Sequence, residues 1–345
     1  IMVYNYDVSG PGVAGGGLAG TTLYNMTDAG LEKNVSIERW KQDASGTVTG
    51  QRLLSSYINT FTYQGGVLRA KSVYDLKNIA PLTYATYTAG PPTNPYSKIQ
   101  QAFEGVTVPA DMEKSTEVKL ADTKGNPLET QINNMNLYKS MIWDTVKGKK
   151  LAEVTSAQYA DIAFSGFEAS IKGNLTYNQN NVVAASAIPV AGISGDYILK
   201  MGNSLAPLTH PGLTAGKEYI LSFWCTATPS FGGAGLPNIT LTNTYSPGNG
   251  WTLYTAKFTP ANNSQLGFIV TSATPTYYLD DVRIYPATAT MQTYNYIPLF
   301  GISSAADANG RMTYYEYDKL GRQTIVRDQN GNIISKTKTY NGGGL

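Results

Sequence analysis

The feature that most constrains this fold is a four-residue pattern, Asp-x-x-Gly, which recurs three times near the C-terminus at intervals of about ten residues. The copies begin at Asp307, Asp318 and Asp328. Asp is favoured at the first position of a type I turn, because its carboxylate accepts hydrogen bonds from the turn's own amides. Glycine three residues later adopts the left-handed conformation that closes a bulged hairpin. Each copy therefore predicts a hairpin tip.

The segments between these tips have the composition of β-strands. Residues 312–317 and 323–327 are rich in tyrosine, threonine and β-branched side chains, which suit a pleated surface. The same turn pattern returns at Asp122 and, more loosely, at Asp43. A hairpin of this length cannot bury a core alone, so neighbouring hairpins must stack. The repeat predicts a sheet that belongs to a larger protein.

The stretch from Gly310 to Arg322 closely resembles the tyrosine-aspartate (YD) repeats of bacterial Rhs proteins. A diverged copy of the repeat lies near 115–160, and the resemblance as a whole covers roughly residues 110–160 and 295–340. It implies strands of a long sheet that coils into a shell. Two family features are missing from this sequence, an Asp-Pro-rich closing motif and a distinct C-terminal toxin domain.

The composition predicts a polar but weakly charged surface. Charged residues make up 14% of the 345 residues, and Lys+Arg 26 against Asp+Glu 24 gives a net charge of +2. Residues 147–150 hold a short lysine cluster but no basic stripe follows, so nucleic acid is not an expected partner. No signal peptide opens the sequence, and no apolar stretch approaches the ~20 residues of a membrane span.

The middle of the chain, residues 163–286, has a different pattern: short alternating runs separated by Gly, Pro and Asn. This spacing predicts an antiparallel β-sandwich. Period-two alternation places Tyr219, Leu221, Phe223 and Cys225 on one face of a strand. Tyr254, Ala256 and Phe258 share a face of another strand, and we expect the two faces to pack against each other.

The order of these runs resembles the jelly-roll modules that bind carbohydrate and accompany secreted bacterial enzymes. The matching segments are 165–168, 213–224, 250–254 and 278–282. The resemblance implies a structural Ca²⁺ between the first and last strands, with Glu168 and Asp280 as donors. Asp280 shares parity with two inward residues, Val282 and Ile284, and a bulge could turn Asp281 inward instead. Solvated carboxylates at strand ends are the alternative.

Sugar binding would require exposed aromatic faces. The candidates for glycan stacking are Trp251, Phe231, Tyr245 and Tyr277, and Trp224 lies opposite the expected core parity. The alternative is that these rings fill the sandwich core or pack against the flanking repeat sheet.

Catalytic residues are not predicted. Cys225 is the only cysteine and lies in a strand-like run, which favours a structural thiol over a nucleophile. His210 stands alone between loop-forming residues and is interpreted as a turn residue. The glycine-rich segment 10–17 lacks the Lys-Ser/Thr ending of a phosphate loop and is interpreted as a loop.

Together these patterns predict an all-β chain with YD-type hairpins flanking a jelly-roll sandwich. The expected domains are 1–162, 163–286 and 287–345. The expected function is a non-catalytic scaffold or binding segment of a larger secreted or cell-surface protein, whose partners are the rest of that protein or assembly and possibly a polysaccharide. The alternatives are a glycan-binding module serving an enzyme or adhesin, and a shell fragment of a polymorphic toxin. Apart from Ca²⁺, no cofactor is expected.

Overall fold

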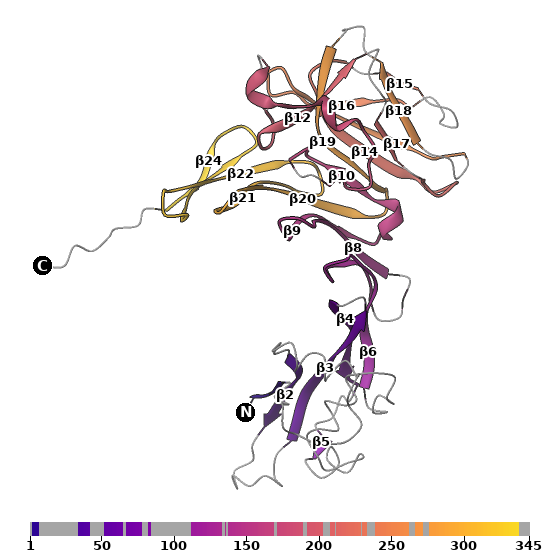
Figure 1. Ribbon diagram of the computed structural model, residues 1–345, viewed down its shortest axis with the longest axis vertical. Helices are drawn as coiled ribbons and strands as arrows, with labels where there is room; N and C mark the ends of the chain where they lie inside the picture. Colours follow the sequence, from indigo (N-terminus) through magenta and orange to yellow (C-terminus); the bar gives the residue numbers. More distant parts are fainter. Residues whose placement is uncertain are drawn as a thin grey trace, which may run out of the picture. The chain divides into compact units, whose positions relative to one another are not determined.

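The computed structural model describes the following residues: 2–6, 34–41, 52–64, 67–77, 82–83, 112–132, 135, 137–168, 171–188, 192–202, 208–210, 212–228, 230–232, 239–261, 266–271 and 276–337. Their regular structure is antiparallel β-sheet, interrupted by short 3₁₀ turns (Figure 1). The all-β prediction is therefore confirmed. The chain divides into two compact units, residues 1–138 and 139–345.

The first unit is a meander of antiparallel strands, each paired with the next along the chain. They are β1 (Met2–Tyr6), β2 (Asn34–Lys41), β3 (Arg52–Gln64), β4 (Val67–Leu76), β6 (Met112–Ala121) and β7 (Pro127–Ile132), with β5 (Leu82–Thr83) paired to β3. The turn pattern at Asp43 and the glycine-rich segment 10–17 lie outside the described residues.

The second unit contains another antiparallel meander, in which the sandwich is inserted in sequence between two paired strands. Its strands are β8 (Leu137–Asp144), β9 (Lys149–Thr155), β20 (Thr290–Ile297), β21 (Gly301–Ala306), β22 (Met312–Tyr317), β23 (Gln323–Asp328) and β24 (Ile333–Lys336). β9 pairs directly with β20, with Thr155 opposite Thr290 and Ala152 opposite Thr293. The sandwich strands, which lie between β9 and β20 in sequence, thus leave and rejoin the meander at neighbouring strands.

The predicted Asp-x-x-Gly turns share one hydrogen-bond pattern. In the last copy, Gly331 N donates to Asp328 O over 3.0 Å, and Asp328 Oδ1 accepts from Asn330 N and Asn332 N, each over 2.9 Å. The turns at Asp122, Asp307 and Asp318 repeat these contacts. Their glycines have φ of 77–87°, the left-handed region that the sequence pattern predicts.

The sandwich consists of a seven-stranded sheet and a three-stranded sheet. The larger sheet contains β11 (Val182–Ala184), β12 (Tyr197–Gly202), β19 (Thr276–Pro286), β14 (Tyr219–Cys225), β17 (Thr252–Phe258) and β16 (Thr242–Tyr245), with β10 (Ala163–Ser165) beside β19. The smaller contains β13 (Leu208–His210), β18 (Leu266–Thr271) and β15 (Ser230–Gly232).

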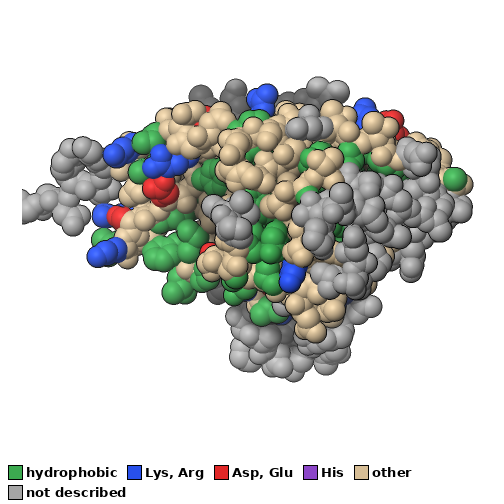
Figure 2. All heavy atoms as spheres, turned by 90° about the horizontal axis from the view of Figure 1, so that it is seen from above, with side chains coloured by type: hydrophobic (Ala, Val, Ile, Leu, Met, Phe, Trp, Pro, Cys, Tyr) green, Lys and Arg blue, Asp and Glu red, His purple; other side chains and the backbone are tan. Residues whose placement is uncertain are grey.

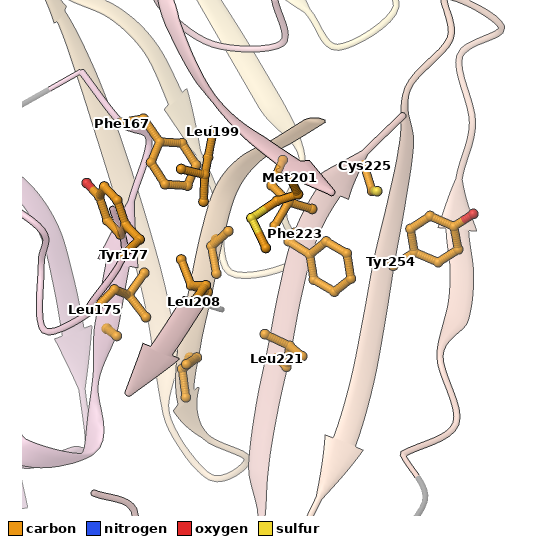
Figure 3. Packing of buried hydrophobic residues seen from close by; sticks show 14 of the residues in the cluster. Phe167, Leu175, Tyr177, Leu199, Met201, Leu208, Leu221, Phe223, Cys225 and Tyr254 are labelled. Carbon is orange, nitrogen blue, oxygen red and sulfur yellow. The ribbon is translucent and has the colours of Figure 1, made fainter. Parts of the chain in front are cut away.

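The sandwich core lies on one face of the larger sheet and is closed by Leu208 of β13 (Figure 3). The predicted inward residues of β14 all belong to it, as do Tyr254 and Phe258. These two sets are lateral neighbours rather than opposing faces, because β14 and β17 pair in the same sheet. Tyr219 stacks beside Phe258 and Phe223 beside Tyr254, each with ring centroids 5.9 Å apart.

The other face of the larger sheet is buried against the meander. One apolar cluster joins Phe164 and Tyr285 of the sandwich to Ile142, Ala152 and Met291 of the meander. A second cluster joins three sandwich residues, Trp224, Trp251 and Leu253, to Ala306 and Met312. The large sheet is thus covered on both faces, which explains why its strands are apolar on both parities.

Helical structure is limited in the described segments to three single 3₁₀ turns: η2 (Tyr159–Asp161), η3 (Gln179–Asn181) and η4 (Ala185–Ala187). No helix in this part of the chain is long and apolar enough to cross a membrane. The face in Figure 2 shows few charged side chains among uncharged ones, in keeping with the composition.

Candidate functional site

The two β19 residues that were predicted as possible calcium ligands, Asp280 and Asp281, lie at a β-bulge. The pairing of β19 with β14 shifts register between Ser222 and Trp224, and Asp281 has a φ of 46°, which is rare for a residue other than glycine. The bulge places both Asp280 and Asp281 between two core residues, Leu279 and Val282. Both aspartates are buried, with 0% and 1% of their surface exposed.

The bulge also reverses the expected direction of Asp280. Val282 and Ile284 face the sandwich core as predicted. Asp280 instead lies opposite Trp224, whose ring is on the meander side of the sheet. Opposite residues of an antiparallel pair share a face, so Asp280 is on the meander side as well. The expectation that Asp280 faces inward with Val282 and Ile284 was wrong, because the extra residue of the bulge breaks the alternation. The bulge itself was expected as the alternative, but it directs Asp281 Oδ1 toward Asn295 of β20 rather than into the sandwich core.

Each aspartate has a different set of hydrogen-bond donors. Asp280 Oδ2 accepts from Ser194 N over 3.0 Å and from Ser194 Oγ over 3.3 Å, and its Oδ1 accepts from Asp281 N over 2.8 Å. Asp281 Oδ1 accepts a long bond, 3.5 Å, from Asn295 Nδ2 on β20. Asp281 Oδ2 is buried and has no hydrogen-bond partner among the described residues. Asp281 is the less satisfied of the two.

Arg283 is the cation of this cluster and is itself 1% exposed. Its Nη1 donates to the Asp307 carbonyl over 3.0 Å, so the side chain reaches from β19 to a meander turn. Its Nε and Nη2 are buried without a hydrogen-bond partner in the described part of the chain. Burial raises the pKa of Asp281, and the guanidinium charge of Arg283 opposes that rise.

Glu168 reaches the same region from the segment that follows β10. Its Oε1 accepts from Tyr197 N over 2.6 Å. Gly195 has a φ of 63°, and a Cβ there would overlap the Glu168 carboxyl. At Gly166, a Cβ would lie 2.8 Å from Asn295 Oδ1 and 3.0 Å from Asp281 Oδ1. A side chain at Gly195 would therefore be strained and would displace Glu168, whereas one at Gly166 would require the ends of Asn295 and Asp281 to shift.

Burial dominates the electrostatics of the three carboxyl groups. It raises the pKa of Glu168 to about 7, helped by the charges of Asp196 and Asp281. Burial, followed by the charge of Asp281, raises the pKa of Asp280 well above its ordinary value. Burial also raises the pKa of Asp281, against the opposing effect of Arg283. Only Asp281 is influenced by the charge of Arg283, so the three buried carboxyl groups together favour either bound protons or a cation.

The donor chemistry fits the predicted calcium ion in part. Carboxylate oxygens suit Ca²⁺, and Asp281 Oδ2 lacks a partner among the described residues. However, those residues contain no group of three or more His, Cys, Asp or Glu side chains arranged to hold a metal ion. Backbone carbonyls would have to supply most of the six to eight oxygens that Ca²⁺ requires. A cavity of about 10 Å³, lined by Glu168, Phe167 and Asn295, has room for about one water molecule.

Most of the described aromatic candidates for glycan binding are buried, and Tyr245 is partly buried. Trp251 and Tyr277 are 0% and 1% exposed, and Trp224, on the opposite parity of β14, is 2% exposed. Tyr245 packs edge-on against Trp224, and its hydroxyl donates to Asn330 Oδ1 of a meander turn. The side chain of Phe231 lies outside the described residues. The stacking prediction is wrong for Trp251 and Tyr277, because the meander and the sandwich core cover them.

Two residues that were not predicted as functional are also buried. His210 ends β13 rather than lying in a turn, and burial lowers its pKa to about 4. Its Nδ1 accepts from Gly212 N over 3.2 Å. Burial raises the pKa of Cys225 to about 12, which leaves the sulfur as an unreactive thiol at neutral pH.

Sequence reasoning missed a second polar cluster, centred on Asp161 of η2. Asp161 accepts from Lys217 Nζ over 2.7 Å, from Thr214 Oγ1 over 3.1 Å, and from the Tyr219 hydroxyl. The contacts fix the segment between β9 and β10 to the start of β14. The only sequence signal was an Asp next to apolar residues, and the pattern gave no indication of its partners.

Comparison with known proteins leaves the family open. No family model and no curated protein matches the chain. One solved structure, described as "Crystal Structure of TcdB2-TccC3-TEV", is similar at 10% identity with a TM-score of 0.17. The alignment covers 88% of this chain and 11% of that one, so this chain spans about a ninth of its length.

Proposed function

We propose that this chain is a non-catalytic scaffold segment of a larger secreted or cell-surface Rhs-like bacterial protein, in which the sandwich is held rigidly on the repeat sheet. The supporting observation is the buried face between the sandwich and the meander. One of its two apolar clusters contains both sandwich tryptophans, Trp224 and Trp251. A module that acted independently would need a polar surface there.

Hydrogen bonds across this interface also favour one orientation of the sandwich on the meander. Arg283 donates to the carbonyl of Asp307, Tyr285 donates to the carbonyl of Ala308 over 3.4 Å, and Tyr245 binds Asn330. All three sandwich side chains therefore contact Asp-x-x-Gly turns. Burying one large apolar side chain contributes roughly 1.5–3 kcal/mol, so the clusters together favour a fixed orientation.

The Trp251→Ala variant separates this proposal from the glycan-binding alternative. If Trp251 is an interface residue, its truncation costs about 3–5 kcal/mol and reduces hydrogen-exchange protection in β20–β22 as well as in β17. If it binds sugar, the variant keeps its stability and loses binding on a glycan array. Phe231→Ala is the matched aromatic variant for the array, because Phe231 lies on β15, in the smaller sheet. Glycan binding lost with unchanged protection in β20–β22 would contradict the scaffold proposal.

The shell-fragment alternative concerns the parent protein rather than this site. It predicts that the complete parent chain encloses a separate domain and protects it from protease. An accessible neighbouring domain would favour an open scaffold.

We also propose that the carboxylate cluster binds Ca²⁺, with Glu168, Asp280 and Asp281 contributing oxygens. The excess of carboxyl groups over the single Arg283 supports this proposal. Calcium would then raise the melting temperature of the full chain, and Glu168→Gln would reduce the increase. A chelator that leaves the melting temperature unchanged, together with no calcium binding by calorimetry, would exclude it.

A further inference from the structure

The meander places three hairpin tips along one edge. Because β8, β9, β20, β21, β22 and β23 pair antiparallel in sequence order, alternate turns lie at the same end of the sheet. The turns 145–148, 298–300 and 318–321 therefore share one edge. Neighbouring hairpins are two strands apart, which is about 10 Å at the usual strand spacing. We call this row the free edge.

The free edge exposes large apolar side chains. Leu299 is fully exposed at 103%, Leu320 is 72% exposed and Val146 is 69% exposed. Ile297 and Phe300 flank Leu299 and are 37% and 42% exposed. Each of the three tips thus presents at least one aliphatic side chain, where turns normally carry polar residues.

The conformation of Leu299 adds a second observation. Its φ is 71°, in the left-handed region, which is unfavourable for a large side chain. Phe300 N donates to Ile297 O over 3.3 Å to close the turn. Glycine would fit this turn without strain, so folding does not explain a fully exposed leucine at its tip.

The free edge carries more exposed lysines than carboxylates that are free to pair with them. Lys147, Lys149 and Lys319 are exposed. The carboxylates of two tips are engaged in their own turns: Asp144 Oδ1 accepts from Val146 N and Lys147 N, each over 3.0 Å. Asp318 accepts from Leu320 N over 2.9 Å and forms an ion pair with Arg322 over 2.7 Å.

The opposite edge of the meander has a different character. Its turns at Asp307 and Asp328 carry Asn309 and Asn330, and they contact the sandwich through Arg283 and Tyr245. One edge is therefore polar and used internally, whereas the free edge is apolar and basic. This asymmetry is not required by the repeat, since Asp318 starts the same turn pattern as Asp307 and Asp328.

From this arrangement we propose that the free edge docks on an anionic lipid bilayer. Exposed leucine, phenylalanine and valine side chains would enter the apolar boundary of the membrane, while the lysines contact lipid phosphates. A row of tips about 10 Å apart contacts a flat surface at several points, which suits a bilayer better than a narrow protein groove.

Vesicle co-sedimentation with the full chain tests this proposal. Vesicles of phosphatidylcholine with about 30% phosphatidylglycerol should retain the protein, and pure phosphatidylcholine vesicles should retain much less. Each lysine near the surface changes partitioning about fivefold, so a Lys147→Glu, Lys319→Glu variant should bind at least about 25-fold more weakly. The Leu299→Ser, Leu320→Ser variant should lose at least about tenfold, because two apolar insertions are removed.

A matched control is Ile334→Ser on β24, since Ile334 is 62% exposed but lies away from the three tips. Its binding should equal that of the parent chain. The proposal is overturned if no vesicle retains the protein, or if the tip variants bind as well as the control. It is also overturned if the parent chain is a dimer in solution that Leu299→Ser, Leu320→Ser converts to monomer without affecting lipid binding, because a second copy would then cover the tips.

Discussion

Replacing Met312 by alanine would open a cavity between the sandwich and the meander. Met312 is 2% exposed and belongs to β22, while its cluster partners Trp224, Trp251 and Leu253 belong to the sandwich. Buried Met→Ala substitutions typically cost about 2–5 kcal/mol, of which the transfer of the lost side chain accounts for roughly half. Because rigid strands surround the site on both sides, we expect little collapse and a loss of about 3 kcal/mol.

Urea unfolding measured by tryptophan fluorescence is the suitable assay, because Trp224 and Trp251 lie in the affected cluster. With a slope of about 2–3 kcal/mol/M, the loss should lower the midpoint by about 1 M. Ile333→Ala is the control, because Ile333 is 49% exposed on β24 and should change stability by less than about 0.5 kcal/mol. A Met312→Ala midpoint equal to that of the control would refute the packing argument.

Three further outcomes are expected. Glu168 has a pKa of about 7 against an ordinary 4.5, so the folded state holds its proton more tightly, and stability should fall by up to about 3 kcal/mol as pH rises from about 4.5 to 7. Unfolding at about pH 5 and pH 8 without calcium checks this, and Glu168→Gln should remove the share of the dependence that Glu168 contributes, while Asp280 and Asp281, whose pKa values are also raised, retain theirs. Gly331→Ala should cost about 1–2 kcal/mol in thermal unfolding from backbone strain alone, because the φ of Gly331 is 82°. No atom of the described residues lies within 4 Å of the position that its Cβ would take. Gly310→Ala should cost more, because its Cβ would also meet Arg283 and Leu253 at 3.4 Å. Cys225 should react with a thiol reagent only after denaturation, and rapid native labelling would contradict its burial.

The local structure of the repeat could be predicted because its determinants are local. Asp328 and Gly331 define their turn through contacts within five residues, so sequence spacing was sufficient. Alternation likewise identified the core face of β14, since each inward residue is two positions from the next. The pairing partner of that strand could not be read in the same way, and β17 lies beside it rather than across the core.

The candidate site was less predictable because it depends on one inserted residue and on distant segments. The bulge at Asp281 moved both carboxylates to the meander side, and alternation alone cannot locate the residue at which a bulge interrupts the register. Trp251 was a candidate for ligand binding because it follows a loop, where an aromatic face can be exposed. It is covered by residues from β21 and β22, more than fifty positions away in sequence.

The direct pairing of β9 with β20 allows the domain inserted between them to be replaced while the meander stays the same. Thr155 and Thr290 are opposite one another, so the meander accommodates the whole sandwich as it would a hairpin loop. Loop-closure entropy grows only with the logarithm of loop length, so a long excursion costs the sheet little more than a short one. A domain at this position can be gained, exchanged or removed without moving any strand by one residue. If the sandwich were removed, other residues would have to bury Ala152 and Met291, which now pack against it.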